Sequence, residues 1–124
     1  MRVLMIDDEE DIRKIGQLSL EAVGHIETAV AASAREGIDL ALGNRPDLIL
    51  IDMMMPGMDG VAALAELRDT PELEDIPVIF MTAKAQPSEV ASYIEKGAIG
   101  VITKPFDPMT LPTEVMRLLG SVNE

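Results

Sequence analysis

The sequence contains no cysteine and very few aromatic residues. Without cysteine, disulfide bonds and thiolate chemistry are excluded, and so is any metal site with cysteine ligands. Aromatic side chains make up only 2% of the 124 residues, which gives too few stacking platforms for binding single-stranded nucleic acid. Continuous apolar runs are short, and none approaches the length of a membrane-spanning helix. The N-terminus lacks a basic segment followed by a long apolar stretch, so we expect no signal peptide.

Basic residues are also scarce. There are 10 lysine and arginine residues against 22 aspartate and glutamate residues, for a formal net charge of −12 at pH 7. Such a charge argues against nucleic acid or an anionic membrane as the main partner, since both attract cationic proteins. The hydrophobic content of 48% is too high for a disordered acidic chain. We therefore expect a soluble cytoplasmic protein, and the length predicts a single domain over residues 1–124.

Short apolar runs alternate with longer amphipathic segments along the chain. The runs lie at residues 3–6, 26–29, 48–51, 78–81 and 99–102. Three of them are continuously apolar, which is typical of strands buried on both faces of a parallel sheet. Between and after them, apolar residues recur at helical spacing in residues 12–22, 34–41, 61–67, 90–94 and 115–119. This strict alternation predicts an α/β, doubly wound three-layer sandwich.

The first helical segment predicts a buried face. Ile12, Ile15 and Leu18 recur every three residues, which places them on one side of a helix. We expect this side to pack in the core. Gly24 should end the helix, because glycine readily adopts the backbone conformation found just after a helix terminus.

The last helical segment contains conflicting start signals. Asp107 and Pro108 are typical of an N-cap and a first helical residue. Pro112, four residues later, would then lack the amide hydrogen that the helix needs and would press on the carbonyl of residue 108. We therefore predict that the regular helix begins near Thr110 or Leu111, after an irregular or 3₁₀ lead-in.

Polar and charged residues stand at the ends of the predicted strands. Asp7 and Asp8 come after the first strand, and Asp52 follows the third. Thr82 ends the fourth strand, and Lys104 follows the fifth. In an open parallel sheet, ligands bind beyond the carboxyl ends of the strands, near the topological switch point. If the sheet forms as predicted, these side chains converge there.

A purely structural interpretation of the acids is also open. Acids after a strand are common as solvated loop residues, and Glu10 and Asp11 suit the first turn of a helix, where negative charge is favourable. Asp52 is harder to explain in this way, since it stands between four apolar strand residues and three methionines. Its position indicates a functional carboxylate at a largely apolar strand end.

Carboxylates gathered at one place repel each other unless a cation lies among them. Two of them ~5 Å apart repel by roughly 3 kcal/mol at an effective dielectric of ~20, which raises some of their pKa values. Oxygen ligands favour a hard cation, and Mg²⁺ binds through one or two carboxylates, waters and a phosphate oxygen. With the charge of Lys104 and the hydroxyl of Thr82, the cluster suits a nucleophilic carboxylate, a metal and a phosphoryl group.

Four motifs carry a resemblance to a known family: residues 6–9 (IDDE), 50–60 (LIDMMMPGMDG), 80–83 (FMTA) and 104–106 (KPF). At these residues the sequence resembles the receiver domain of two-component response regulators, and the likeness runs from Arg2 to about Leu119. The spacing between the motifs also agrees with that of close family members. The resemblance implies a flavodoxin-like (βα)5 fold with parallel strands in the order 2-1-3-4-5.

The resemblance also implies a role for each acid. Asp52 would be the phosphoacceptor, taking a phosphoryl group from a histidine kinase or a histidine phosphotransfer protein. Mg²⁺ would be bound directly by Asp8, Asp52 and the backbone carbonyl of Met54, and by Asp7 through a water molecule. The protein would catalyse only its own phosphorylation and dephosphorylation, so we do not expect an enzyme that acts on other substrates.

The resemblance further implies that residues at or just after the ends of the fourth and fifth strands bind the phosphoryl group. The Lys104 ammonium would pair with one phosphoryl oxygen, while the Thr82 hydroxyl and the Ala83 backbone amide would donate hydrogen bonds to others. The Lys104–Pro105 peptide would be cis and would aim the lysine. The chemistry then rests on positioning and charge neutralisation.

One position departs from the family pattern. Many receivers carry tyrosine or phenylalanine three residues before the lysine, where this sequence has Val101. In the usual scheme, the threonine moves toward the phosphoryl group and the aromatic ring swings into the vacated space. Because valine has no ring, we expect a muted or differently routed switch, through the loop after Thr82 or through Tyr93.

Three functions are left as alternatives. The first, which we expect, is a stand-alone receiver that signals through contacts with a downstream protein target. The second is a phosphorelay intermediate or phosphate sink with weak conformational output, which Val101 favours. The third is a Mg²⁺-dependent phosphatase, although the first motif of that family usually spaces its acids by one residue, whereas Asp7 and Asp8 are adjacent. We expect neither nucleic acid nor a membrane as a partner.

Overall fold

Five parallel strands form the centre of the structure, a computed structural model that describes residues 1–122. The strands are β1 (Arg2–Ile6), β2 (Glu27–Ala31), β3 (Leu48–Asp52), β4 (Val78–Thr82) and β5 (Gly100–Thr103). They pair in the order β2-β1-β3-β4-β5, and every pairing is parallel. The predicted doubly wound α/β fold and its strand order are confirmed.

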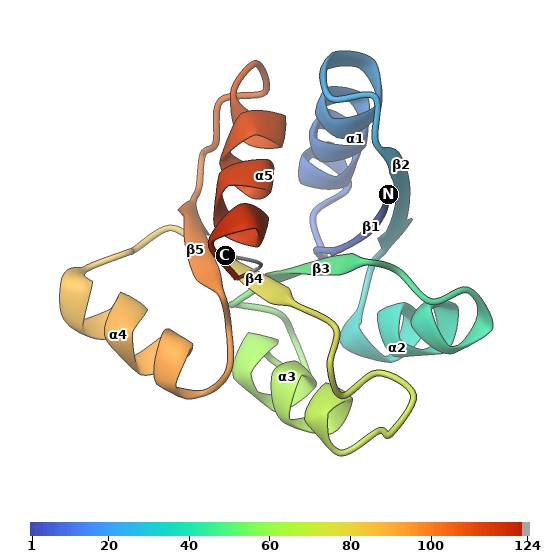
Figure 1. The fold of residues 1–124 in the computed structure, drawn as a ribbon, viewed down its shortest axis with the longest axis vertical. Coiled ribbons are helices and arrows are strands. Elements are labelled where there is room, and N and C mark those ends of the chain that lie inside the picture. The colour runs from blue at the N-terminus through green and yellow to red at the C-terminus, as the bar shows by residue number, and fades with distance from the viewer. Residues whose placement is uncertain (123–124) are drawn as a thin grey trace.

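Helices cover both faces of this sheet (Figure 1). They are α1 (Glu10–Leu18), the π-helical segment η1 (Ser19–Val23), α2 (Ala34–Gly43), α3 (Gly60–Arg68), α4 (Pro87–Glu95) and α5 (Leu111–Val122). Helices α1 and α5 lie on one face, and α2, α3 and α4 lie on the other. Within residues 1–122, no helix combines the length and the apolar character needed to cross a membrane.

Side chains of the strands alternate between two cores. Val3 and Met5 of β1 pack toward α5 and η1, while Leu4 and Ile6 pack toward α2 and α3, as the two-residue period of a strand requires. Strands β3 and β4 are buried at every position. Burial on both faces explains why these segments read as unbroken apolar runs.

The buried face of the first helix differs from the prediction. Ile12 is half-buried, but Ile15 and Leu18 expose 42% and 68% of their surface. The prediction that Ile15 and Leu18 belong to the core is therefore wrong. The apolar spacing was a poor guide because the buried residue of α1 is a glycine, Gly16, which a search for apolar side chains passes over.

Gly16 and the π-helical segment explain the difference. Gly16 is buried, and a Cβ atom at this position would lie 2.4 Å from Met5 Sδ, so a larger residue here would force the Met5 side chain to move. The helix then continues as the wider π-helical segment η1, in which Ser19 and Leu20 are buried. The helical segment ends immediately before Gly24, as predicted.

The start of α5 agrees with the prediction. The helix begins at Leu111, after a turn in which the carbonyl of Asp107 accepts hydrogen bonds from the amides of Thr110 and Leu111 at 3.0 and 2.9 Å. Pro112 is therefore the second helical residue, a position where an amide hydrogen has no acceptor within the helix. The proline is accommodated without breaking the helix.

Candidate functional site

The carboxyl ends of β1, β3 and β5 bring three charged residues into contact. Asp7 follows β1, Asp52 is the last residue of β3, and Lys104 follows β5. The Lys104 Nζ atom lies 3.0 Å from Asp7 Oδ2 and 3.3 Å from Asp52 Oδ1. Both aspartates are buried, so these ion pairs are largely withdrawn from water. The site therefore forms at the place where the strand order indicated it.

Asp8 and Glu9 complete an acidic cluster with Asp7 and Asp52. One carboxylate oxygen from each of these four residues lies within 4.8 Å of the others. The side of the cluster formed by Asp8 and Glu9 is exposed. This all-oxygen donor set fits a hard divalent cation such as Mg²⁺. Glu9 was not a predicted site residue, and its only signal in the sequence was its place in the acidic run after the first strand.

Asp7 is held in place through all of its polar atoms. Its amide donates to the carbonyl of Ala31 at 3.0 Å, and its carbonyl accepts from Arg13 Nη1 at 2.8 Å. Its carboxylate accepts from the amide of Glu9 at 2.9 Å and from Lys104 Nζ at 3.0 Å. With both carboxylate oxygens already engaged, Asp7 suits an indirect contact with a metal better than a direct one.

The carboxyl group of Asp52 holds its proton more tightly than an ordinary aspartate. Burial first, and the negative charge of Asp7 second, raise its pKa from 3.8 to about 6. The charge of Lys104 and a hydrogen bond from the Met54 amide, at 3.3 Å, act in the opposite direction. Asp52 is consequently ionised at neutral pH, but at an energetic cost that a cation would relieve.

Lys104 remains protonated despite its burial. Desolvation lowers the pKa of its ammonium group, but the hydrogen bond and charge of Asp7, together with the charge of Asp52, raise it more, so the net pKa lies above its usual value. The Lys104–Pro105 peptide is cis, as the resemblance implied. The site therefore carries one fixed positive charge among its carboxylates.

Thr82, Ala83 and Met54 surround this charged cluster. Thr82 is the buried last residue of β4, and its Oγ1 accepts from the amide of Lys84 at 3.2 Å. Ala83 follows it directly and is exposed. Met54 lies two residues after Asp52 and is 76% exposed. These residues stand at the same edge of the sheet as the acids, so their predicted roles are compatible with the fold.

Val101 lies on β5, where it is half-buried and pairs with Phe80 of β4. The ring of Phe80 contacts Tyr93 of α4 edge to face, with ring centroids 5.4 Å apart. Tyr93 and Val101 both pack against the core on the α4 side of the sheet. The aromatic rings on this face therefore come from Phe80 of β4 and Tyr93 of α4, while β5 supplies none at position 101.

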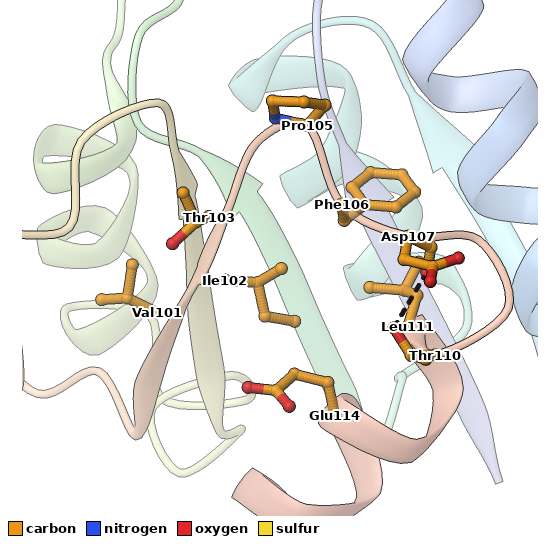
Figure 2. A pocket seen from close by; sticks show the side chains of 9 residues that line it. All are labelled: Val101, Ile102, Thr103, Pro105, Phe106, Asp107, Thr110, Leu111 and Glu114. Carbon is orange, nitrogen blue, oxygen red and sulfur yellow. Dashed lines mark hydrogen bonds between the residues drawn. The ribbon is translucent and has the colours of Figure 1, made fainter.

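A small groove of about 260 Å³ lies between β5 and the first turn of α5. Figure 2 shows the side chains that line it, among them the buried Ile102 and Leu111 and the exposed Asp107. None of the four clustered acids lines it. The groove is thus separate from the charged site at the strand ends.

The family model for the response regulator receiver domain matches residues 3–116. Among curated proteins, the transcriptional regulatory protein CseB of Streptomyces avermitilis is 37% identical over 117 residues, which is 94% of this chain and 48% of CseB. Response regulator Rre1 of Synechocystis is 34% identical over 118 residues, covering 95% of this chain and 51% of Rre1. The chain therefore spans about half the length of these relatives.

Solved structures show the same likeness. Chemotaxis protein CheY4 of Vibrio cholerae matches with a TM-score of 0.86 and 31% identity, covering 94% of this chain and 97% of CheY4. The signal receiver domain of a histidine kinase from Syntrophus aciditrophicus matches with a TM-score of 0.81 and 35% identity, covering 99% of this chain and 92% of that one. Together with the strand-end acids and the cis peptide, these matches show that the chain belongs to the response regulator receiver domain family of two-component systems.

Proposed function

We propose that Asp52 accepts a phosphoryl group from a phosphohistidine of a kinase or phosphotransfer protein, with Mg²⁺ bound beside it. The observation that carries this proposal is the contact of Lys104 with two buried carboxylates inside a larger cluster of oxygen donors. A buried, ionised carboxylate can act as a nucleophile, and the neighbouring ammonium group of Lys104 lies where it can stabilise part of the negative charge of an incoming phosphoryl group.

The donor set indicates which residues would hold the ion. Asp8, Asp52 and the backbone carbonyl of Met54 would bind it, with Asp7 acting through water because its carboxylate oxygens are already hydrogen-bonded. Bound there, Mg²⁺ supplies neutralisation of the charge that gathers on the phosphoryl oxygens. The exposed position of Asp8 leaves a path for the ion from solvent.

The transfer step uses groups of this chain in separate roles. A carboxylate oxygen of Asp52 attacks phosphorus, and the nitrogen–phosphorus bond of the donor breaks with its electron pair returning to the imidazole. Lys104 stabilises one phosphoryl oxygen, and Thr82 and the Ala83 amide donate hydrogen bonds to the others. The product is an acyl phosphate on Asp52, which water later hydrolyses to regenerate the carboxylate. The protein thus catalyses only its own modification.

The exposed face of α1 is the proposed contact surface for the phosphoryl donor. The side chains of Ile15 and Leu18 lie outside the core and present apolar surface to solvent. Helix α1 begins only three residues after Asp7 in the chain, so this surface belongs to the element next to the site. Exposed apolar side chains near a site are typical of a protein-binding surface. We place this exchange, and the contact with a downstream protein target, in the cytoplasm.

A phosphorelay intermediate or phosphate sink is the second candidate. It is favoured by Val101, because β5 offers no aromatic ring that could carry a phosphorylation signal to the surface beside α4. In either case the phosphoryl group first reaches Asp52. The two candidates differ only in what happens to it afterwards.

Radiolabelling with a small acyl or amido phosphate donor tests the proposal. Label should enter the wild type in the presence of Mg²⁺, and chelation or Asp52→Asn should abolish it. Asp39→Asn, on the exposed side of α2, is the matched control and should label normally. Equal labelling of Asp52→Asn would refute the site. A chase with histidine phosphotransfer proteins then separates the candidates, because a relay returns the label to histidine and a sink releases it as inorganic phosphate.

A further inference from the structure

Arg13 connects α1 to the loop that carries the acids. Its side chain is half-buried, and its Nη1 donates to the backbone carbonyl of Asp7 at 2.8 Å. The pairing of β1 with both of its neighbours, β2 and β3, stops one residue earlier, at Ile6, so this carbonyl lies beyond the hydrogen-bond ladders of the sheet. A buried carbonyl without a partner is unfavourable. Arg13 thus completes the hydrogen bonding of β1 at the point where the strand gives way to the acidic loop.

The contact controls where the next carboxylates lie. The carbonyl of Asp7 belongs to the same peptide plane as the amide of Asp8, so its position helps to set the direction in which the Asp8 side chain leaves the backbone. The Asp7 carboxylate in turn accepts the amide of Glu9 at 2.9 Å. Loss of the Arg13 hydrogen bond would therefore loosen three consecutive residues of the acidic cluster together.

We infer that Arg13 is a positioning residue that holds the acidic loop, residues 7–9, in the geometry that binds a divalent cation. This inference rests on the proposed function, since it concerns the metal site of the same reaction. It assigns Arg13 a role through the backbone of Asp7, without contact between its guanidinium group and the ion or the phosphoryl group.

Positioning and simple electrostatics give opposite expectations for this residue. Arg13 is a cation near a cation site, so its charge alone opposes metal binding. If only charge mattered, removing Arg13 would tighten the binding of Mg²⁺. If the hydrogen bond to Asp7 positions the acids, its removal weakens binding in spite of the lost repulsion. Partners that orient metal ligands typically contribute tenfold or more to metal affinity.

The experiment is a calorimetric Mg²⁺ titration of the wild type, Arg13→Met, Arg13→Lys and Lys14→Ala. Methionine keeps much of the apolar stem and removes both the charge and the donor. Lys14 is the matched control, because it is the neighbouring cation on α1 but pairs with Glu10 at 2.8 Å instead of contacting the acidic loop. We expect Arg13→Met to weaken Mg²⁺ binding by about tenfold, and Lys14→Ala to leave it unchanged or slightly tighter.

Arg13→Lys keeps the charge but offers a shorter, single-point donor. Its affinity for Mg²⁺ should therefore lie between those of the wild type and Arg13→Met. A second measurement needs no metal. The amide resonance of Asp8 in metal-free protein should shift and exchange faster in Arg13→Met, and should match the wild type in Lys14→Ala.

The outcomes separate this inference from the proposed function. Wild-type affinity in Arg13→Met with an unshifted Asp8 amide would overturn the role of Arg13 alone. Tighter binding in both Arg13→Met and Lys14→Ala would also overturn it, in favour of a pure charge effect. Absence of Mg²⁺ binding by the wild type would overturn the proposed metal site itself. Should Arg13→Met not fold, Arg13→Lys decides, and wild-type affinity in that variant refutes the inference.

Discussion

Replacing Asp52 with asparagine should stabilise the metal-free protein at neutral pH. In the folded state, burial first and the charge of Asp7 second raise the pKa of Asp52 from 3.8 to about 6. The folded protein therefore binds this proton more tightly than the unfolded chain does. The free energy of unfolding therefore decreases as the pH rises from about 4 through about 6, and it loses nothing further from this group above that range.

The size of the effect follows from the pKa shift. One pKa unit corresponds to about 1.4 kcal/mol, so a shift of about two units destabilises the ionised form by about 3 kcal/mol at pH 7.5. The attraction of Lys104 is already included in this shift. Asparagine has nearly the same shape and no charge, and we expect it to recover most of this free energy at pH 7.5 and little of it at pH 4.5.

Urea unfolding at pH 4.5 and 7.5 in the presence of a chelator measures this difference. When Asp52→Asn is compared with the wild type at each pH, the contributions of the other acids to the free energy of unfolding largely cancel. Asp39→Asn should change the free energy of unfolding by less than about 0.5 kcal/mol at either pH, as exposed substitutions usually do. Added Mg²⁺ should stabilise the wild type more than Asp52→Asn. A variant no more stable than the wild type at pH 7.5, with a difference independent of pH, would refute the reasoning.

Three further predictions concern neighbouring positions. Lys104→Met leaves two buried carboxylates without their cation, so in chelator we expect a loss of about 3 kcal/mol in urea unfolding. Wild-type stability would contradict this. Gly60→Ala places a Cβ 2.9 Å from Met53 Cα, and thermal melts should show a loss of about 1–3 kcal/mol. An unchanged midpoint would disprove the close contact. In NMR spectra with a phosphoryl mimic, α4 amides should shift more in Val101→Tyr than in the wild type, and equally large shifts would refute a muted switch.

Much of the fold and the central residues of the site could be predicted, because both depend on where the buried strands lie in the sequence and on where they end. Unbroken apolar runs identified the buried strands, and parallel strands bring their carboxyl ends to one edge. Asp7, Asp52 and Lys104 were therefore expected to meet although they are far apart in the chain, and the structure places them in contact. The arrangement depends on topology, which the alternation of elements reveals.

Other features depend on tertiary contacts that spacing does not encode. The inward face of α1 was predicted wrongly because Gly16 has no side chain to signal its close packing on Met5. The π-helical segment after α1 likewise has no distinctive composition. The contact between Arg13 and Asp7 involves a long, flexible side chain, whose partner becomes identifiable only once α1 and β1 are placed together.

We have proposed that the carboxylates of Asp8, which follows β1, and Asp52, at the end of β3, bind one divalent cation together. Crystals soaked in Mn²⁺, which replaces Mg²⁺ at oxygen sites and scatters anomalously, test this most directly. We expect one anomalous peak within ligand distance of the carboxylates of Asp8 and Asp52 and of the Met54 carbonyl, with Lys104 still beside Asp52. An occupied site elsewhere on the chain, with no peak among these three residues, would contradict it.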